Sequence, residues 1–174
     1  MRLALYCSVL LGLLAGPALA GTIDVYVVPA SQSVNISAGT ATVNLVANIP
    51  VTDPLIAFGL DLDLTGSSVT YGGAAVDGFF DAAYAPDGDG LAGLVHVPPG
   101  SITGNGIVLA TITLNLVSLG TTQLMPGYTI GDVFEGLSTP TGFNAGAFFP
   151  GTIEVTPEPA ALALLGLGLL LRRR

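Results

Sequence analysis

The fold class is decided by one stretch of sequence, Ile56-Ala57-Phe58-Gly59-Leu60-Asp61-Leu62-Asp63-Leu64-Thr65. Every second residue in it is large and apolar, and the residues between are small or polar. Successive side chains of a β-strand point to opposite faces of a sheet, so this pattern places one face in a core and the other in water. We therefore expect a half-buried β-strand over residues 56–65.

The same period of two recurs on both sides of this stretch. It predicts long strands over 22–27, 42–49 and 107–117, and shorter strands over 32–37, 69–71, 91–97, 121–125 and 152–155. The strand over 107–117 carries apolar residues on both faces, which indicates a central position with both faces covered.

Glycine- and proline-rich turns separate these strands, and helix signals are almost absent from the middle of the chain. We expect one helical turn or an irregular flap over 78–85, and a Gly/Phe-rich loop over 139–151. The predicted fold is all-β: an antiparallel β-sandwich of the jelly-roll type. It forms a single domain over residues 21–155, which we call the body.

The N-terminus has the order of a secretory signal peptide. Arg2 is positive, residues 3–14 are mainly apolar, and Ala18 and Ala20 are small residues at the positions that a signal peptidase reads. We expect a signal helix over residues 1–20 that signal peptidase removes. The alternative is an N-terminal anchor that is never cut.

The expected cut lies just before Gly21, and it would remove the only cysteine, Cys7. The exported chain would then have no thiol for a disulfide, a nucleophile or a metal ligand. A body of about 135 residues can bury a core without a disulfide.

The C-terminus carries a second membrane-active segment. Pro157-Glu158-Pro159 is followed by an apolar stretch over 160–171 and by Arg172, Arg173 and Arg174. As a helix, the apolar stretch spans about 18 Å, against a bilayer hydrocarbon core of about 30 Å. The positive end favours the cytoplasmic side. We expect a short hydrophobic helix that anchors the chain transiently in a membrane.

This arrangement resembles the PEP-CTERM sorting signals of Gram-negative bacteria. The resemblance rests on the order of the Pro-Glu-Pro, the apolar helix and the arginine cluster at the end of an exported chain. It implies a sorting domain over 156–174 that an exosortase recognises and cuts near the Pro-Glu-Pro. It also implies a stay at the inner membrane, followed by the cell surface or the extracellular polysaccharide matrix.

The body is acidic without basic residues to balance it. Between Gly21 and Thr156 there is no Lys or Arg, and there are nine Asp and two Glu. Such a surface repels nucleic acid and anionic lipid, so neither is expected as a partner. It favours cations instead.

Asp87-Gly88-Asp89-Gly90 is the candidate cation site. Alternating carboxylates and glycines let a loop wrap oxygen atoms around a hard cation, so Asp87 and Asp89 are candidate calcium ligands. The alternative is a polar turn, because Asp and Gly favour turns on their own account. Apart from this possible calcium, no cofactor is expected.

Catalytic patterns are weak in this chain. Asp61 and Asp63 lie two residues apart on one strand face, whereas a glycosidase needs two carboxylates that face each other across a bond. His96 is the single histidine, so no second histidine is present to build a zinc site. The sequence therefore predicts a protein that is not an enzyme.

The body also resembles cohesin-type domains. The resemblance covers roughly residues 22–125 and rests on three segments, which are residues 33–45, 57–64 and 109–116, the last followed by Gly120. It implies a jelly-roll sandwich related to some carbohydrate-binding modules. Cohesins of cellulosomes grip a dockerin, but no residue of this chain matches a known dockerin contact.

Three functions remain open from the sequence. The first is an exported structural or adhesion protein that is sorted by an exosortase. The second is a binding module for a protein partner or for extracellular polysaccharide. The third is a secreted glycan hydrolase whose carboxylate site the sequence does not reveal.

Overall fold

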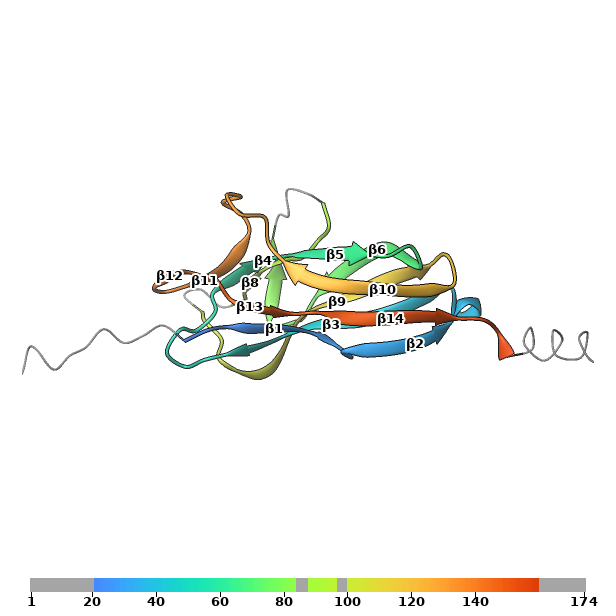
Figure 1. The fold of residues 1–174 in the computed structure, drawn as a ribbon. Helices are drawn as coiled ribbons and strands as arrows, with labels where there is room; N and C mark the ends of the chain where they lie inside the picture. Colours follow the sequence, from blue (N-terminus) through green and yellow to red (C-terminus); the bar gives the residue numbers. More distant parts are fainter. Residues whose placement is uncertain (1–20, 84–87, 97–99, 160–174) are drawn as a thin grey trace, which may run out of the picture.

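The computed structural model describes residues 21–83, 88–96 and 100–159. These residues form an elongated molecule of strands in which the described chain starts and ends at opposite ends (Figure 1). The expected signal helix over 1–20 and the expected hydrophobic helix over 160–171 lie outside the described residues. Within the described residues, the structure has no helix long and apolar enough to cross a membrane.

Three sheets build the body. The first has the order β13 (Ala147–Phe149), β1 (Asp24–Val28), β3 (Thr40–Ile49), β9 (Gly104–Leu116) and β6 (Val69–Val76). The second has the order β2 (Ser31–Asn35), β14 (Gly151–Thr156), β10 (Gly120–Gly127) and β5 (Asp61–Thr65). The third has the order β12 (Gly142–Asn144), β11 (Gly136–Thr139), β4 (Ala57–Gly59), β8 (Ala92–Val95) and β7 (Phe80–Ala82).

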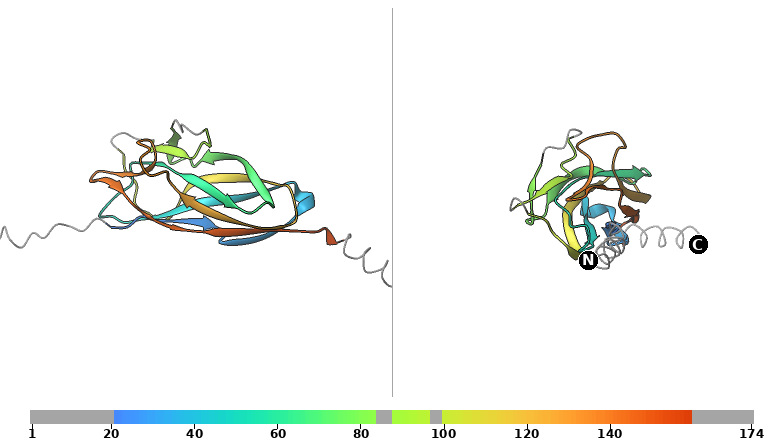
Figure 2. Two further views of the ribbon diagram at one scale, coloured as in Figure 1. Left: turned by 45° about the horizontal axis from the view of Figure 1, so that its top comes forward. Right: turned by 90° about the vertical axis from the view of Figure 1, so that its left-hand side faces the viewer.

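The second and third sheets share one layer of the sandwich. The chain passes between them twice, from β4 to β5 and from β10 to β11, so that they lie end to end (Figures 1 and 2). The first sheet covers their inner face. The all-β sandwich predicted from the alternating pattern is thus confirmed, although the β1–β13 and β14–β2 pairs are parallel.

The core lies between the two layers and is almost entirely aliphatic. As predicted, β9 is central and pairs with both β3 and β6. Its consecutive residues Leu109 and Ala110 are both fully buried, so both faces of the strand are covered. The largest fully buried side chains are Ile23, Leu45, Leu55, Leu91, Leu109, Ile112, Leu114, Leu124, Leu137 and Ile153.

The deciding stretch over 56–65 forms two strands rather than one. β4 pairs with β8 and β11 in the third sheet, whereas β5 pairs with β10 in the second. The change occurs at Leu60, whose backbone N–H donates to the carbonyl of Leu91 at 3.0 Å. The period of two survives the switch because the same face stays toward the core.

Two expectations for irregular segments were wrong. The Gly/Phe-rich loop expected over 139–151 contains β12 and β13, which extend two sheet edges. The helical turn or flap expected over 78–85 contains the strand β7, which pairs with β8. These strands have three residues each, too few to show a clear alternation, and their partners are distant in the sequence.

Candidate binding surface

Four large apolar side chains stand exposed at the end of the molecule where the described chain starts. Ile130, Val133 and Phe134 are 90%, 74% and 62% exposed in the loop between β10 and β11, and Phe143 of β12 is 70% exposed. In Figure 1 this loop is the orange segment that rises beside β11 and β4. We call these four residues the apolar end. Large apolar side chains exposed near one another are typical of interaction sites.

Hydrogen bonds hold the loop of the apolar end in one shape. The Phe134 N–H donates to Oδ1 of Asp132 at 2.8 Å, and the Asp132 N–H donates to the carbonyl of Thr129 at 3.1 Å. The Thr129 hydroxyl donates to Oδ2 of Asp61 on β5 at 3.0 Å, which ties the loop to the second sheet. The apolar side chains are thus presented by an ordered loop, which lowers the entropy lost on binding.

Gly59 lets the same loop lie flat on β4. A Cβ at Gly59 would overlap the carbonyl oxygen of Phe134 and would lie 3.1 Å from Cα of Glu135. Only glycine permits this close approach of two backbones.

A hollow of about 320 Å³ opens between the loop and β12. Val133 and Phe143 supply apolar walls, and Asp132 and Glu135 supply carboxylates. The remaining lining residues are Tyr128, Gly131, Gly136, Asn144 and Ala145.

The outer face of the third sheet adjoins the apolar end, because Phe143 belongs to both. The strand register places Phe143, Ser138, Ala57, Leu94 and Asp81 in one row across β12, β11, β4, β8 and β7. Directly paired residues point to the same face of a sheet, so this row faces outward together. Phe143 and Leu94 are the large exposed members, and the small Ser138 and Ala57 between them are half-buried.

The charge around the apolar end is negative. Asp132, Glu135 and Asp61 lie in or beside the loop, and the body has no Lys or Arg to offset them. An apolar surface with an acidic rim favours a partner whose own apolar patch is flanked by basic residues.

A buried polar network holds β12 against the segment that contains Asp53. The Asp53 carboxylate, only 1% exposed, accepts hydrogen bonds from Oγ1 of Thr141 at 2.8 Å and from Nδ2 of Asn144 at 2.7 Å. Burial by itself raises the pKa of Asp53, but hydrogen bonds from the side chains of Asn144, Thr139 and Thr141 lower it by more. The net pKa of Asp53 therefore lies below its ordinary value, and the group is ionised at neutral pH.

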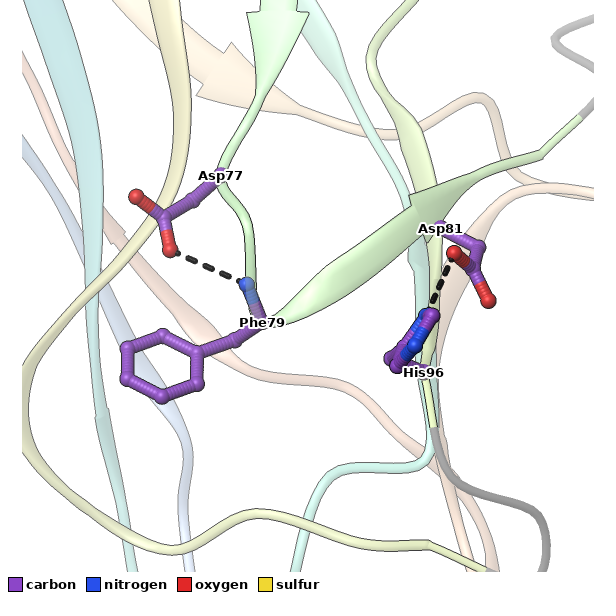
Figure 3. Close-up of polar contacts among 4 residues, drawn as sticks. All are labelled: Asp77, Phe79, Asp81 and His96. Carbon is purple, nitrogen blue, oxygen red and sulfur yellow. Dashed lines mark hydrogen bonds and ion pairs between the residues drawn. The ribbon is translucent and has the colours of Figure 1, made fainter.

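His96 and Asp81 are hydrogen-bonded at the opposite edge of the third sheet. Nδ1 of His96 lies 2.7 Å from Oδ1 of Asp81, and both side chains are largely exposed. Figure 3 shows the ring of Phe79 pointing away from this pair, with the Phe79 N–H donating to Asp77 at 3.2 Å. Phe79 and His96 line a second hollow of about 360 Å³.

The calcium prediction remains a prediction. Asp87 lies outside the described residues. The Asp89 side chain accepts a hydrogen bond from the Leu91 N–H at 2.8 Å, and its carbonyl accepts one from the hydroxyl of Tyr71 at 2.7 Å. Among the described residues, no group of three or more His, Cys, Asp or Glu side chains is placed to hold a metal ion.

The predicted processing residues lie at the margins of the described chain. Ala18, Ala20 and Arg172, Arg173 and Arg174 are outside it. Pro157 is half-buried, and its carbonyl accepts a hydrogen bond from Nδ2 of Asn35 at 3.1 Å. Glu158 and Pro159 are exposed beyond the end of β14.

Comparison with solved structures identifies the architecture of the body. It is similar to the seventh ScaB type I cohesin of Pseudobacteroides cellulosolvens, with a TM-score of 0.51 and 14% identity over 79% of this chain and 94% of that one. It is similar to the cohesin module of a family 33 glycoside hydrolase from Clostridium perfringens, with a TM-score of 0.57 and 8% identity over 80% of this chain and 98% of that one. The body has the cohesin fold.

A cohesin outside cellulosomes has the same fold as the body. The non-cellulosomal cohesin of the archaeon Archaeoglobus fulgidus matches with a TM-score of 0.50 and 12% identity over 82% of this chain and 97% of that one. No family model matches the chain, and no curated protein matches it either. At these identities, what the cohesin-fold body shares with the three structures is the fold.

Sequence reasoning did not find the apolar end. No structure was predicted for residues 128–135, and Phe143 was placed in the loop expected over 139–151. The signal was nevertheless present, because Ile130, Val133 and Phe134 are large apolar residues in a segment without strand alternation. Asp53 was also missed, since Thr52-Asp53-Pro54 reads as a simple turn.

Proposed function

We propose that this chain is an exported, non-catalytic binding module whose cohesin-fold body holds a protein partner through the apolar end. The observation that carries the proposal is the exposure of Ile130, Val133, Phe134 and Phe143 at one end of the body, where Val133 and Phe143 line a hollow. Interface hot spots are typically aromatic or aliphatic anchors that fill a pocket in the partner. The cohesin fold supports a protein as the partner class.

The charge of the body indicates which kind of partner protein is favoured. Because the apolar end is surrounded by carboxylates and the body lacks Lys and Arg, a partner with Lys or Arg around an apolar pocket is favoured. Association with such a partner slows as salt rises, since exposed charges are screened beyond about 8 Å at physiological ionic strength.

The delivery route follows from the two ends of the chain. A signal peptide removed at Ala20 exports the body, and the PEP-CTERM tail holds it at the inner membrane until an exosortase acts. β14 ends at the far end of the molecule from the apolar end (Figure 1). An anchor that follows Pro159 therefore leaves the apolar end directed away from the membrane, where a partner can reach it.

Polysaccharide is the second candidate ligand. Phe79 is an exposed aromatic ring beside a hollow that His96 also lines, and an aromatic face near polar groups suits a sugar. Several other aromatic rings pack against each other. The ring centroids of Tyr26 and Phe149 are stacked 4.6 Å apart, and Phe58 packs edge-on against Phe80. The third function, glycan hydrolysis, gains no support from Asp61, which is bonded to the β10–β11 loop.

A rebinding assay separates these functions. Purified mature protein is added to cells that lack its gene, and the fraction that sediments with the cells is measured. Phe134→Ser/Phe143→Ser is expected to weaken retention about tenfold or more, because each removes an exposed anchor. Val117→Ser/Leu119→Ser is the matched control, since both residues are 52% exposed in the β9–β10 turn at the opposite end.

Enzymatic treatment of the cells before the assay shows whether the ligand is a protein or a polysaccharide. Protease treatment of the cells beforehand is expected to abolish retention, and treatment with glycan-degrading enzymes to leave it intact. The reverse pattern, together with a loss of retention in Phe79→Ala alone, would support the polysaccharide candidate instead. Equal retention of the two double variants would show that the apolar end is not the binding surface.

A further inference from the structure

Asp53 is a buried carboxylate without a cationic side chain beside it. It is 1% exposed, and the side chains that bond to it, those of Thr139, Thr141 and Asn144, are all neutral. No Lys or Arg occurs between Gly21 and Thr156, and His96 is paired with Asp81 at 2.7 Å. Buried carboxylates in proteins are usually paired with a cation or bound to a metal.

Gly21, the first residue after the predicted signal peptide, is linked to this carboxylate through Asn144. Nδ2 of Asn144 donates to the carbonyl of Gly21 at 2.6 Å and to Oδ2 of Asp53 at 2.7 Å. One amide group thus bridges the first residue of the mature chain and the buried carboxylate. Gly21 and Asp53 also line one cavity of about 430 Å³, together with Thr22 and Thr141.

Gly21 is held tightly in this place. A Cβ on Gly21 would lie 2.6 Å from Cγ of Pro50 and 2.9 Å from Oγ1 of Thr52, so only glycine fits. The Ile23 N–H that follows donates to Oδ1 of Asn144 at 3.5 Å. Contacts on both sides therefore fix the position of Gly21, which lines the same cavity as Asp53.

Removal of the signal peptide changes the chemistry of this nitrogen. Hydrolysis of the Ala20–Gly21 amide consumes one water and breaks the C–N bond. The oxygen goes to the carbonyl carbon of Ala20, which becomes a carboxylate, and the nitrogen of Gly21 becomes an ammonium group. An amide N–H without net charge is thereby replaced by a cation beside a buried anion.

We propose that the α-ammonium group created at Gly21 binds in this cavity as the counter-ion of Asp53. Cleavage of the leader then completes the polar network under β12, which also carries Phe143. A charge-assisted hydrogen bond is roughly twice as strong as a neutral one. The folded body thereby favours the processed chain over the precursor.

This inference rests on the export route in the proposed function, and it is independent of what the apolar end binds. The mass of the secreted body gives its first residue directly. A mature chain that starts at Gly21 fits the inference, and a start at any other residue overturns it. The result leaves the test of the apolar end unaffected.

The sequence makes a selective test possible. The chain contains no lysine, so the α-amino group is the only primary amine in the mature protein. Acetylation removes its charge, whereas reductive dimethylation keeps it. Among the described residues that line the cavity, Asp53 is the only titratable side chain.

The readouts are the pKa of the α-amino group and the melting temperature at neutral pH. The pKa of the α-amino group is expected about one unit or more above its usual range of about 7.7 to 8.0. Acetylation is expected to lower the melting temperature by several degrees, and dimethylation to lower it by much less. In Asp53→Asn, acetylation is expected to have little effect.

Two results would overturn the inference. One is an α-amino group that titrates in its usual range in a protein whose melting temperature acetylation leaves unchanged. The other is a fall in melting temperature on acetylation that is equally large in the parent protein and in Asp53→Asn. If Asp53→Asn fails to fold, the pKa of the α-amino group in the parent protein still tests the inference.

Discussion

Oδ2 of Asp53 accepts a hydrogen bond from Nδ2 of Asn144 at 2.7 Å, across a sequence separation of 91 residues. The bond joins the segment before β4 to the end of β12. It lies at the base of the strand that presents Phe143, so the shape of the apolar end depends on a buried charge far from it in the sequence.

The buried charge predicts a loss of stability in acid. The pKa of Asp53 is lower in the folded chain than in the unfolded chain, where it is about 3.9. Its contribution is therefore fully present above about pH 4 and is lost as the pH falls through the folded pKa. Asp53→Asn is expected to cost about 1–3 kcal/mol at pH 7, because an NH2 donor replaces one of the two acceptor oxygens and leaves one buried donor without a partner.

The measurement is urea unfolding of the parent protein and of Asp53→Asn between pH 7 and pH 2. The stability difference between them should shrink as the pH falls below about 4. Asp63→Asn removes an exposed carboxylate from β5 and controls for the change in net charge. A difference that stays constant over this range would contradict a lowered pKa of Asp53.

Gly59 predicts a steric coupling between β4 and the apolar end. Gly59→Ala is expected to destabilise the fold by about 1–3 kcal/mol, since the new Cβ would overlap the carbonyl oxygen of Phe134. It should also weaken retention on cells, because the loop that carries Phe134 is displaced. Gly78→Ala is the matched control, as no atom lies within 4 Å of its added Cβ. Equal melting temperatures for the two variants would refute the close approach.

The calcium proposal for Asp87 and Asp89 predicts a ligand effect on stability. Millimolar Ca²⁺ is expected to raise the melting temperature of the mature protein, because a ligand that binds only the folded state stabilises it. Asp87→Ala/Asp89→Ala should abolish the rise. Magnesium at the same concentration controls for general screening of the acidic surface. A flat calcium response would leave the segment as a turn held by the Asp89–Leu91 bond at 2.8 Å.

The tail predicts where the protein is found. Deletion of residues 160–174 is expected to release the body from cells, because the apolar helix and the arginines would be gone. Cell fractionation with an antibody to the body measures this. A variant with Arg172, Arg173 and Arg174 changed to Gln tests the charge separately from the apolar helix. Membrane association that persists in the deletion would mean that the anchor lies elsewhere.

The sequence predicts the parts of this fold that follow from local alternation. The strands around Val43, Phe58 and Ile112 were found because their burial repeats every two residues. The switch of sheets at Leu60 was not found, because its cause is a hydrogen bond to Leu91 from another part of the chain. The strands β12 and β13 were missed since three residues with neighbouring glycines carry no usable period.

The candidate site was harder to predict than the fold. Exposure of Phe143 and Ile130 is a property of the assembled layers, and an isolated sequence reads such residues as core candidates. The burial of Asp53 likewise arises from Thr141 and Asn144, which are 88 and 91 residues away. Contacts of this range leave no signal in local composition.

The central claim is that the apolar end touches a protein partner, and in-cell photo-crosslinking tests it most directly. A photoreactive phenylalanine analogue is placed at Phe143 in one strain and at Leu119, in the β9–β10 turn at the other end, in a second. The account predicts a discrete, protease-sensitive adduct from position 143 and none from position 119. No adduct from position 143, or the same adducts from both positions, would contradict it.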